Sequence, residues 1–238
     1  MDQHLPVEAL SGFLDVDKTA QYRAVPPLRS LPVLRGSSAK LLRRIHDPAV
    51  ELVIWQRRLP RDLKHWLGSL PSGRLPDGRV LVGRDSLLPA VLSIFAASST
   101  PAHPMRRTLA EDVAAMAGLF ADVMATDLVD LRLEAIQSDA CWKFHRDCVV
   151  ARLLTTYRGP GTEWIQPAQS ERALLRQRTF DGRVERFPTH AVGLFKGSCT
   201  EPARGIVHRS PPIAGSGAAR LLLCLNMPSE TSPEVWVG

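Results

Sequence analysis

The chain has 238 residues, of which 45% are hydrophobic and 23% charged, so it is long and apolar enough to bury one substantial core. It shows no signal-peptide pattern, and its longest apolar stretch, at residues 87–97, is too short to span a bilayer, so we expect a cytoplasmic protein without membrane contact. The net charge of +6 is compatible with nucleic-acid binding, but the basic residues are spread out without an aromatic-interleaved stripe, which favours a compositional bias towards arginine.

Residues 1–127 are predicted to form a mostly helical portion behind an extended lead-in. The first 48 residues contain a proline-rich stretch at 26–36 and one short helix near 39–45. Residues 50–57 are rich in β-branched and aromatic side chains, which predicts a strand. After it we expect a helix opened by Pro60 and Asp62, a turn at 73–78 and an apolar helix at 86–97.

The clearest helix is predicted at residues 108–126. Its apolar residues recur at steps of three and four, at Leu109, Val113, Met116, Leu119, Phe120 and Val123. Thr108 with Glu111 three residues later resembles a capping box, so the helix is expected to begin there. Its apolar stripe requires a partner surface.

Residues 128–238 are predicted to form a jelly-roll core, which makes the fold class α+β. The hydrophobic period changes to two at residues 128–136, as in a strand with one buried face. Eight strand candidates, the number in a double-sheet jelly roll, lie at residues 128–136, 141–146, 148–157, 162–166, 174–180, 190–196, 204–208 and 219–226. Within them, the segment 167–188 suits a surface helix or loop equally well.

The four cysteines form no C-x-x-C pair, which argues against a disulfide framework. They lie in apolar or strand-like settings at positions 141, 148, 199 and 224. We therefore expect reduced and mostly buried thiols.

A small set of residues carries the functional signal. His145 and Asp147 stand one residue apart, His208 follows 63 positions after His145, and Arg220 lies 12 positions further on. Two imidazoles and one carboxylate can occupy one face of a six-coordinate Fe(II) and leave positions open for a co-substrate and oxygen. An arginine on the next strand can hold a carboxylate through a two-pronged contact. Taken singly, however, each of these residues has an ordinary structural interpretation, such as a capping histidine or a solvated arginine.

Together with their surroundings these residues resemble a known group of enzymes. The stretches FHRD, TYRGPGTEW, GLFKG, GIVHRSPP and RLLLCLN look like a bacterial family that carries only a domain-of-unknown-function label, and similar strands occur in Fe(II)/2-oxoglutarate-dependent oxygenases. The resemblance covers about residues 128–228. It implies His145, Asp147 and His208 as iron ligands and Arg220 as the anchor for 2-oxoglutarate. It also implies a hydroxylase or demethylase type of reaction on a small-molecule or peptide substrate that the sequence does not identify.

Three further residues have two interpretations each. Tyr157 is a candidate second donor to the 2-oxoglutarate carboxylate, but a half-buried strand tyrosine bonded to the backbone explains it equally well. Arg132 and Arg152 lie on the polar faces of their strands, where they could contact substrate or cosubstrate. Solvated strand charges are the favoured explanation for both arginines.

Other function classes remain open or are disfavoured. The crowding of Cys141, His145, Asp147 and Cys148 suggests a non-redox metal-handling protein, with Zn(II) as the ion, although strand alternation directs Cys148 away from the others. A cupin-like module that keeps the metal ligands without catalysis is a further alternative. The sequence has no G-x-S-x-G elbow, no phosphate-binding loop and no H-E-x-x-H motif, which disfavours hydrolases, nucleotidases and zinc proteases.

Overall fold

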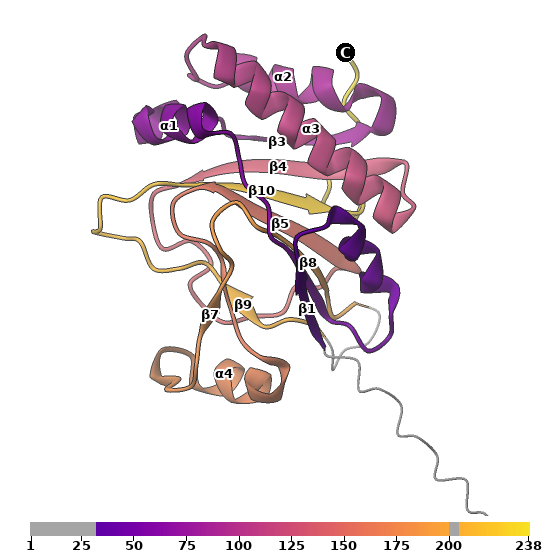
Figure 1. Cartoon of the computed structure of the whole chain (residues 1–238), viewed down its shortest axis with the longest axis vertical. Coiled ribbons are helices and arrows are strands. Elements are labelled where there is room, and N and C mark those ends of the chain that lie inside the picture. Colours follow the sequence, from indigo (N-terminus) through magenta and orange to yellow (C-terminus); the bar gives the residue numbers. More distant parts are fainter. Residues whose placement is uncertain (1–31, 200–204) are drawn as a thin grey trace, which may run out of the picture.

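A computed structural model describes residues 32–199 and 205–238 and has three layers (Figure 1). Helices α1 (Arg61–Ser69), α2 (Leu87–Ala97) and α3 (Pro104–Met124) cover one face of a seven-stranded sheet. A three-stranded sheet and α4 (Ser170–Arg176) lie on the other side of that sheet. The molecule is therefore a mixed α/β protein, and most of the lead-in predicted at residues 1–48 lies outside the described residues.

The large sheet combines strands from both halves of the chain. Its order is β1-β2-β8-β5-β10-β4-β3, in which β1 and β2 are parallel and the other neighbours antiparallel. The small sheet has the order β7-β6-β9 and is antiparallel. The strands are β1 (Val33–Gly36), β2 (Leu52–Trp55), β3 (Gly78–Gly83), β4 (Leu128–Ile136), β5 (Ala151–Arg158), β6 (Glu163–Trp164), β7 (Glu185–Arg186), β8 (Val192–Lys196), β9 (His208–Arg209) and β10 (Arg220–Asn226).

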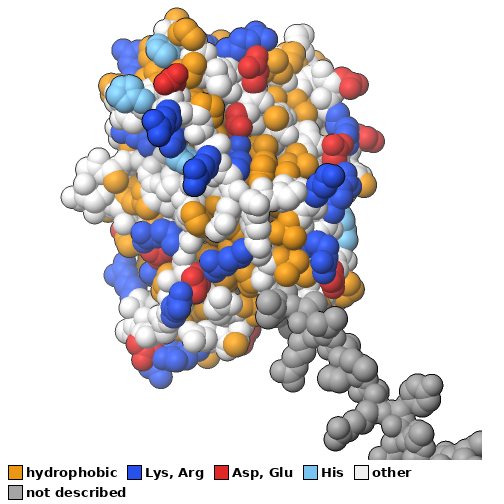
Figure 2. Space-filling model, viewed as in Figure 1, with side chains coloured by type: hydrophobic (Ala, Val, Ile, Leu, Met, Phe, Trp, Pro, Cys, Tyr) orange, Lys and Arg blue, Asp and Glu red, His pale blue; other side chains and the backbone are white. Residues whose placement is uncertain are grey.

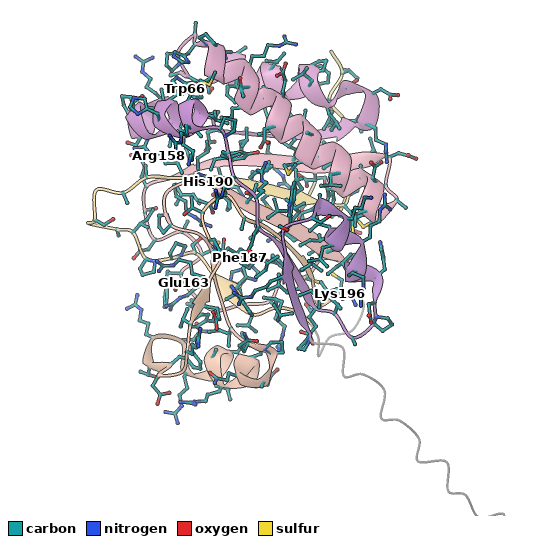
Figure 3. All side chains as sticks on the ribbon, in the orientation of Figure 1. Trp66, Arg158, Glu163, Phe187, His190 and Lys196 are labelled. Carbon is teal, nitrogen blue, oxygen red and sulfur yellow. The ribbon has the colours of Figure 1, made fainter. Side chains whose placement is uncertain are left out.

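The two faces of the large sheet take alternate residues of each strand. In β10, Leu221, Leu223 and Leu225 pack in the core beneath the helices, because strand side chains point to opposite faces in turn. Leu222 and Cys224 instead join a second core, which contains Trp164 and Phe187 of the segment around the small sheet; Figure 3 shows Phe187 in this space, with Glu163 below it.

Helix α3 begins four residues earlier than the capping box predicted. Pro104 occupies its first turn, where a missing N–H costs no hydrogen bond, and the His103 ring accepts a hydrogen bond from the N–H of Met105. His103 also stacks on Trp66 of α1, with ring centroids 5.5 Å apart. The predicted capping role of Thr108 is therefore wrong, since residue 108 lies inside the helix.

Several sequence predictions correspond to observed elements. The strands predicted at 50–57, 128–136, 162–166, 190–196 and 219–226 contain β2, β4, β6, β8 and β10, and the strand predicted at 148–157 overlaps β5, which ends one residue later. The helices predicted after Pro60, at 86–97 and at 108–126 correspond to α1, α2 and α3. The short helix predicted at 39–45 is a 3-10 helix at Ala39–His46. The candidate at 204–208 overlaps β9 only at His208, and its first residue lies outside the described residues.

Two predicted strands are absent from the described residues. The segment 141–146 is a turn, because Cys141 has a left-handed φ of 45° and only His145 forms a β-bridge. The segment 174–180 is helical: it contains the end of α4 and a 3-10 turn, and Ala173 of α4 is buried in a small cluster with Phe144 and Ile165.

The portion predicted as mostly helical also contributes strands. β1, β2 and β3 all precede residue 127, so strands from both sides of the predicted boundary at 127/128 form the large sheet. The turn predicted at 73–78 ends on Gly78, the first residue of β3, and the rest of this strand was not predicted. That glycine begins the strand where α2 approaches it, and a Cβ atom there would lie 2.8 Å from Ile94.

The helices and the charged surface side chains bear on two expectations from the sequence, those on membrane contact and on basic residues. None of their helices combines the length and the apolar character that crossing a bilayer requires. Figure 2 shows Lys and Arg side chains interspersed with acidic and apolar ones over the visible face.

Candidate metal centre and its cavity

A backbone bridge brings the two candidate histidines together. The N–H of His145 donates to the carbonyl of His208 at 3.0 Å, and the N–H of His208 donates back to the carbonyl of His145 at 3.0 Å. Their rings consequently lie side by side, with centroids 4.5 Å apart. Asp147 follows two residues after His145, and one ligand atom of each of the three residues lies within 4.8 Å of the others. The structure thus brings together His145, Asp147 and His208.

Both imidazole rings are held in the same orientation by backbone carbonyls. Nδ1 of His145 lies 2.8 Å from the carbonyl of Lys143, and Nδ1 of His208 lies 3.1 Å from the carbonyl of Ile206. A carbonyl only accepts hydrogen bonds, so each Nδ1 carries the hydrogen and each Nε2 is left to face Asp147. Metal-binding histidines are commonly fixed in this way by a partner on the second ring nitrogen.

The Asp147 carboxylate is buried between three cationic or cationisable groups. Its Oδ1 lies 3.5 Å from His145 Nε2, and its Oδ2 lies 3.2 Å from His208 Nε2 and 2.6 Å from Arg152 Nη1. Burial by itself would raise the pKa of Asp147, but the two imidazoles and the Arg152 guanidinium hold this pKa well below its usual range. The same contact with Asp147 raises the pKa of His145. Asp147 is therefore a negatively charged carboxylate at neutral pH, which is the form that binds a metal cation.

The donor set fits a divalent transition metal. Asp147 Oδ2 is buried and accepts no hydrogen bond of ordinary geometry among the described residues, despite its close contacts. Two imidazole nitrogens and one carboxylate oxygen, with open space on one side, are the ligands of mononuclear Fe(II) sites, and zinc also accepts them. A bound cation would satisfy Oδ2 and accept the lone pairs of the two Nε2 atoms.

Arg220 is a buried cation without a carboxylate partner in the parts of the chain described here. It begins β10 and is only 1% exposed. Its guanidinium donates to neutral acceptors: the carbonyl of Pro160 at 2.9 Å and the hydroxyls of Ser210 at 3.1 Å, Thr162 at 2.5 Å and Thr156 at 3.4 Å. Burial lowers its pKa to about 10, so it remains charged at neutral pH. Buried charges are usually paired, so this one indicates an anion-binding position.

One cavity of about 310 Å³ joins the metal centre to Arg220. His145 and His208 line one part of it, and Arg220 lines another. Between them lie apolar side chains, and further arginines complete the wall. The lining residues are Arg79, Arg132, Glu134, Ile136, Ala140, Cys141, His145, Arg152, Leu154, Thr162, His208, Ser210, Arg220, Leu222, Cys224, Asn226 and Thr231.

Tyr157 does not reach this cavity. Its side chain belongs to the core under the helices, where its hydroxyl donates to Asp112 of α3 at 2.5 Å. Arg57 pairs with the same carboxylate, at 2.7 Å. This position contradicts the prediction that Tyr157 assists Arg220 in binding 2-oxoglutarate, because neighbouring strand residues face opposite sides of the sheet.

Arg132 and Arg152 both line the cavity. The Arg152 side chain is mostly buried, which differs from the favoured explanation of a solvated strand charge, whereas the Arg132 side chain is 50% exposed and agrees with it. Arg152 contacts Asp147 and also donates from Nε to Asn226 at 2.7 Å. Sequence reasoning did not single out Arg79, Thr162, Ser210 or Asn226. Alternation along the strand could have identified Asn226, because residues 220 and 226 of β10 point to the same face of the sheet.

The cysteines differ from the expectation of mostly buried thiols. Only Cys224 is buried, whereas Cys141, Cys148 and Cys199 are exposed. Cys148 and Cys199 lie next to each other, with their sulfur atoms 2.7 Å apart. The group of candidate ligands within the described residues contains no cysteine, although Cys141 lines the cavity. The four-ligand cage of Cys141, His145, Asp147 and Cys148 is therefore not formed.

Comparison with known proteins assigns the family. The model of a family of proteins of unknown function, DUF1826, matches residues 36–226. The chain belongs to the DUF1826 family. The expected membership of a domain-of-unknown-function family is thereby confirmed. No curated protein matches the chain.

Solved structures with similarity to this DUF1826 protein include several oxygenases. A rice dioxygenase for auxin oxidation is 14% identical over 86% of this chain and 87% of its own, with a TM-score of 0.44. A Pseudomonas putida prolyl-4-hydroxylase is 11% identical over 81% and 94%, with a TM-score of 0.41. The Kdo hydroxylase KdoO, a non-heme Fe(II) alphaketoglutarate dependent dioxygenase, is 10% identical over 82% and 89%, with a TM-score of 0.41. At these values the chemistry of the site has to be derived from its own side chains.

Proposed function

We propose that this DUF1826 protein is an Fe(II)/2-oxoglutarate-dependent oxygenase of the hydroxylase or demethylase type, with a jelly-roll core. One observation carries the proposal: two imidazoles and a buried arginine without a carboxylate partner line the same cavity, and the Asp147 carboxylate lies against both imidazoles. Three protein ligands leave part of the coordination sphere of iron open, as a reaction with oxygen and a keto acid requires.

Each ligand has a defined task. His145, Asp147 and His208 would hold the metal, and the carbonyls of Lys143 and Ile206 would keep both Nε2 atoms directed at it. When bound, Fe(II) supplies the activation of oxygen that is coupled to oxidative decarboxylation of the keto acid. Arg152 holds the Asp147 carboxylate in place through the contact at Oδ2.

Arg220 would bind the distal carboxylate of 2-oxoglutarate. The four contacts described above use Nε, both hydrogens of Nη2 and one of Nη1, so the buried positive charge and the remaining Nη1 hydrogen would hold the carboxylate. The hydroxyls of Ser210 and Thr162 hold the guanidinium in position, and both residues line the cavity. The apolar side chains of Leu154 and Leu222 exclude water between this anchor and the metal ligands.

The first experiment measures succinate formed from 2-oxoglutarate by purified protein with Fe(II) in air. We expect slow formation even without a prime substrate, and none from the His145→Ala variant. Arg107→Gln, an exposed change on α3, is the matched control and should behave as wild type. Absence of turnover from wild-type protein with bound iron would contradict the proposal. As a second experiment, a crystal grown anaerobically with iron and N-oxalylglycine, an unreactive mimic of 2-oxoglutarate, would show the iron ligands and the residue that binds the distal carboxylate.

Binding of Zn(II) without redox chemistry is the second candidate. It is favoured by the thiol of Cys141, which lines the same cavity as His145 and is a ligand that zinc accepts. Metal analysis of the purified protein and of its Cys141→Ser variant separates the two functions. Zinc that is retained by wild type and lost from Cys141→Ser would support this second function, whereas the oxygenase requires no contribution from Cys141.

A further inference from the structure

Two arginines oppose each other at the exposed end of the cavity. Arg79 of β3 and Arg132 of β4 are register partners, and both line the cavity. Their side chains are 37% and 50% exposed, in contrast to buried Arg220. Like charges directly opposite on antiparallel strands destabilise a sheet. Sheet stability therefore does not account for this pair, which we call the arginine pair.

Each guanidinium of the arginine pair keeps donors that no described residue accepts. Arg79 uses Nε and Nη2 for the two oxygens of Asp130, at 2.9 and 2.6 Å, which leaves Nη1. Arg132 uses Nη2 for Glu134 at 2.9 Å, which leaves Nε and Nη1. Each arginine therefore keeps at least one charged N–H donor for an oxygen of a phosphate or carboxylate.

The charge around the cavity favours an anion. Four arginines and Glu134 line the cavity, while Asp130 and Asp147 pair with two of these arginines. With neutral histidines, the four arginines and the three carboxylates carry a net charge of plus one. A divalent metal and a dianionic keto acid would leave this net charge unchanged, so the loaded site would still attract a second anion.

The register gives the distance at which such an anion would lie. Arg132 is opposite Cys224, and Cys224 is opposite Leu154, so two strand spacings, or about 10 Å, separate Arg132 from β5. β5 carries Arg152, which contacts Asp147. Between them on β10 lie Cys224, opposite Arg132, and Asn226, opposite Arg152, and both line the cavity.

We propose that the arginine pair binds the anionic group of a small organic substrate, a phosphate, sulfate or carboxylate, whose aliphatic body extends towards the metal ligands. The inference rests on the proposed oxygenase function and adds the substrate class to it. A cavity of about 310 Å³ is at the lower end of the range for small-molecule sites, which favours a small molecule over an enclosed polymer.

The test is calorimetric titration of the metal-free full chain with n-butyl phosphate at low ionic strength, with n-butanol as the neutral probe. Wild type should bind the phosphate and not the alcohol. Arg132→Gln should weaken phosphate binding roughly tenfold, because a charge-assisted contact is lost. It is the primary variant, since Arg79→Gln would leave buried Asp130 without its cation. Arg107→Gln should bind as wild type does, and Arg220→Gln, a change in the same cavity, should weaken phosphate binding less than Arg132→Gln does.

Succinate formation, measured in parallel, separates this inference from the proposed function. Phosphate binding that depends on Arg132 supports the anion site, whether or not wild type forms succinate. Three results would overturn it: no phosphate binding by wild type, equal affinity in wild type and Arg132→Gln, or a loss confined to Arg220→Gln. The last result would place the anion at the cosubstrate anchor.

Discussion

The two faces of the large sheet are built by the same strands, yet their charged groups are arranged differently. On the helical face, the cation Arg57 is balanced by Asp112, which also accepts the hydroxyl hydrogen of Tyr157. On the cavity face, Arg220 is buried among neutral acceptors, and Asp147 keeps an oxygen without a proper hydrogen bond. A balanced buried charge is a structural element, whereas an unbalanced one indicates a missing ligand.

The largest effect is expected from a change on the cavity face that spares the fold. His208→Ala should abolish iron binding and reduce succinate formation more than about 100-fold, because a ligand is lost outright. Its thermal unfolding midpoint in the absence of metal should stay near that of wild type. Iron content and succinate yield check this prediction, and a variant that still binds iron stoichiometrically would contradict it.

A substitution on the helical face should have the opposite result, a loss of stability without a loss of iron binding. Leu223 is fully buried under the helices, so Leu223→Ala should lower the free energy of unfolding by about 2–5 kcal/mol. The residual folded protein should keep its affinity for iron. Urea unfolding followed by circular dichroism measures the first quantity and anaerobic iron titration the second. A large loss of iron affinity would mean that the two faces are not independent.

Arg220→Gln tests the unbalanced cation itself. Loss of its charge-assisted contacts should raise the KM for 2-oxoglutarate about tenfold to 100-fold. Stability should change little or increase, since a buried charge without a carboxylate partner is removed. Steady-state kinetics and urea unfolding measure both. An unchanged KM would show that Arg220 does not bind the cosubstrate.

Tyr157→Phe distinguishes the sequence prediction from the observed position of this side chain. The loss of the hydrogen bond to Asp112 should lower the free energy of unfolding by about 1.5–3 kcal/mol, because a hydrogen bond to a charged group is removed. The KM for 2-oxoglutarate should equal that of wild type. A raised KM with unchanged stability would restore the cosubstrate role.

The smallest effect concerns the loop that joins the two cavity-face residues His208 and Arg220. Asp139 accepts hydrogen bonds from the backbone N–H groups of Ala214 and Ile213, which lower its pKa. A lowered folded-state pKa stabilises the protein above the unfolded value, near 3.9, and this contribution is lost as the pH falls through the lowered value. Asp139→Ala should therefore be less stable than wild type at pH 7, and the difference should shrink at about pH 3. Urea midpoints at both pH values test this.

The sequence predicted those features that depend on local periodicity or on residue type. β4 was predicted with its observed bounds, because Leu131 and Leu133 alternate clearly with polar residues. The candidate metal ligands were found as residue types, but the bridge between His145 and His208 joins positions far apart in the chain. No local pattern encodes such pairing. The side taken by Tyr157 likewise depends on the register of β5, where a shift of one residue reverses every side chain.

Sequence reasoning missed β3 and the helical turn at 174–180 for a related reason. Gly78 looks like a turn residue until α2 is packed against it. The stretch after residue 170 becomes helical where Ala173 can be buried beneath its neighbours. Both outcomes are decided by contacts with distant segments, and tertiary contacts override weak local preference.

The position of β10 has a consequence for biosynthesis. This strand is the last in the chain, yet it lies in the interior of the large sheet, between β5 and β4. While a ribosome still holds residues 220–226 in its exit tunnel, β4 and β5 have no common neighbour, and neither face of the sheet can close. Closure of the large sheet therefore has to wait until residues 220–226 have left the tunnel, and nascent chains that stall before this strand expose apolar edges that chaperones recognise.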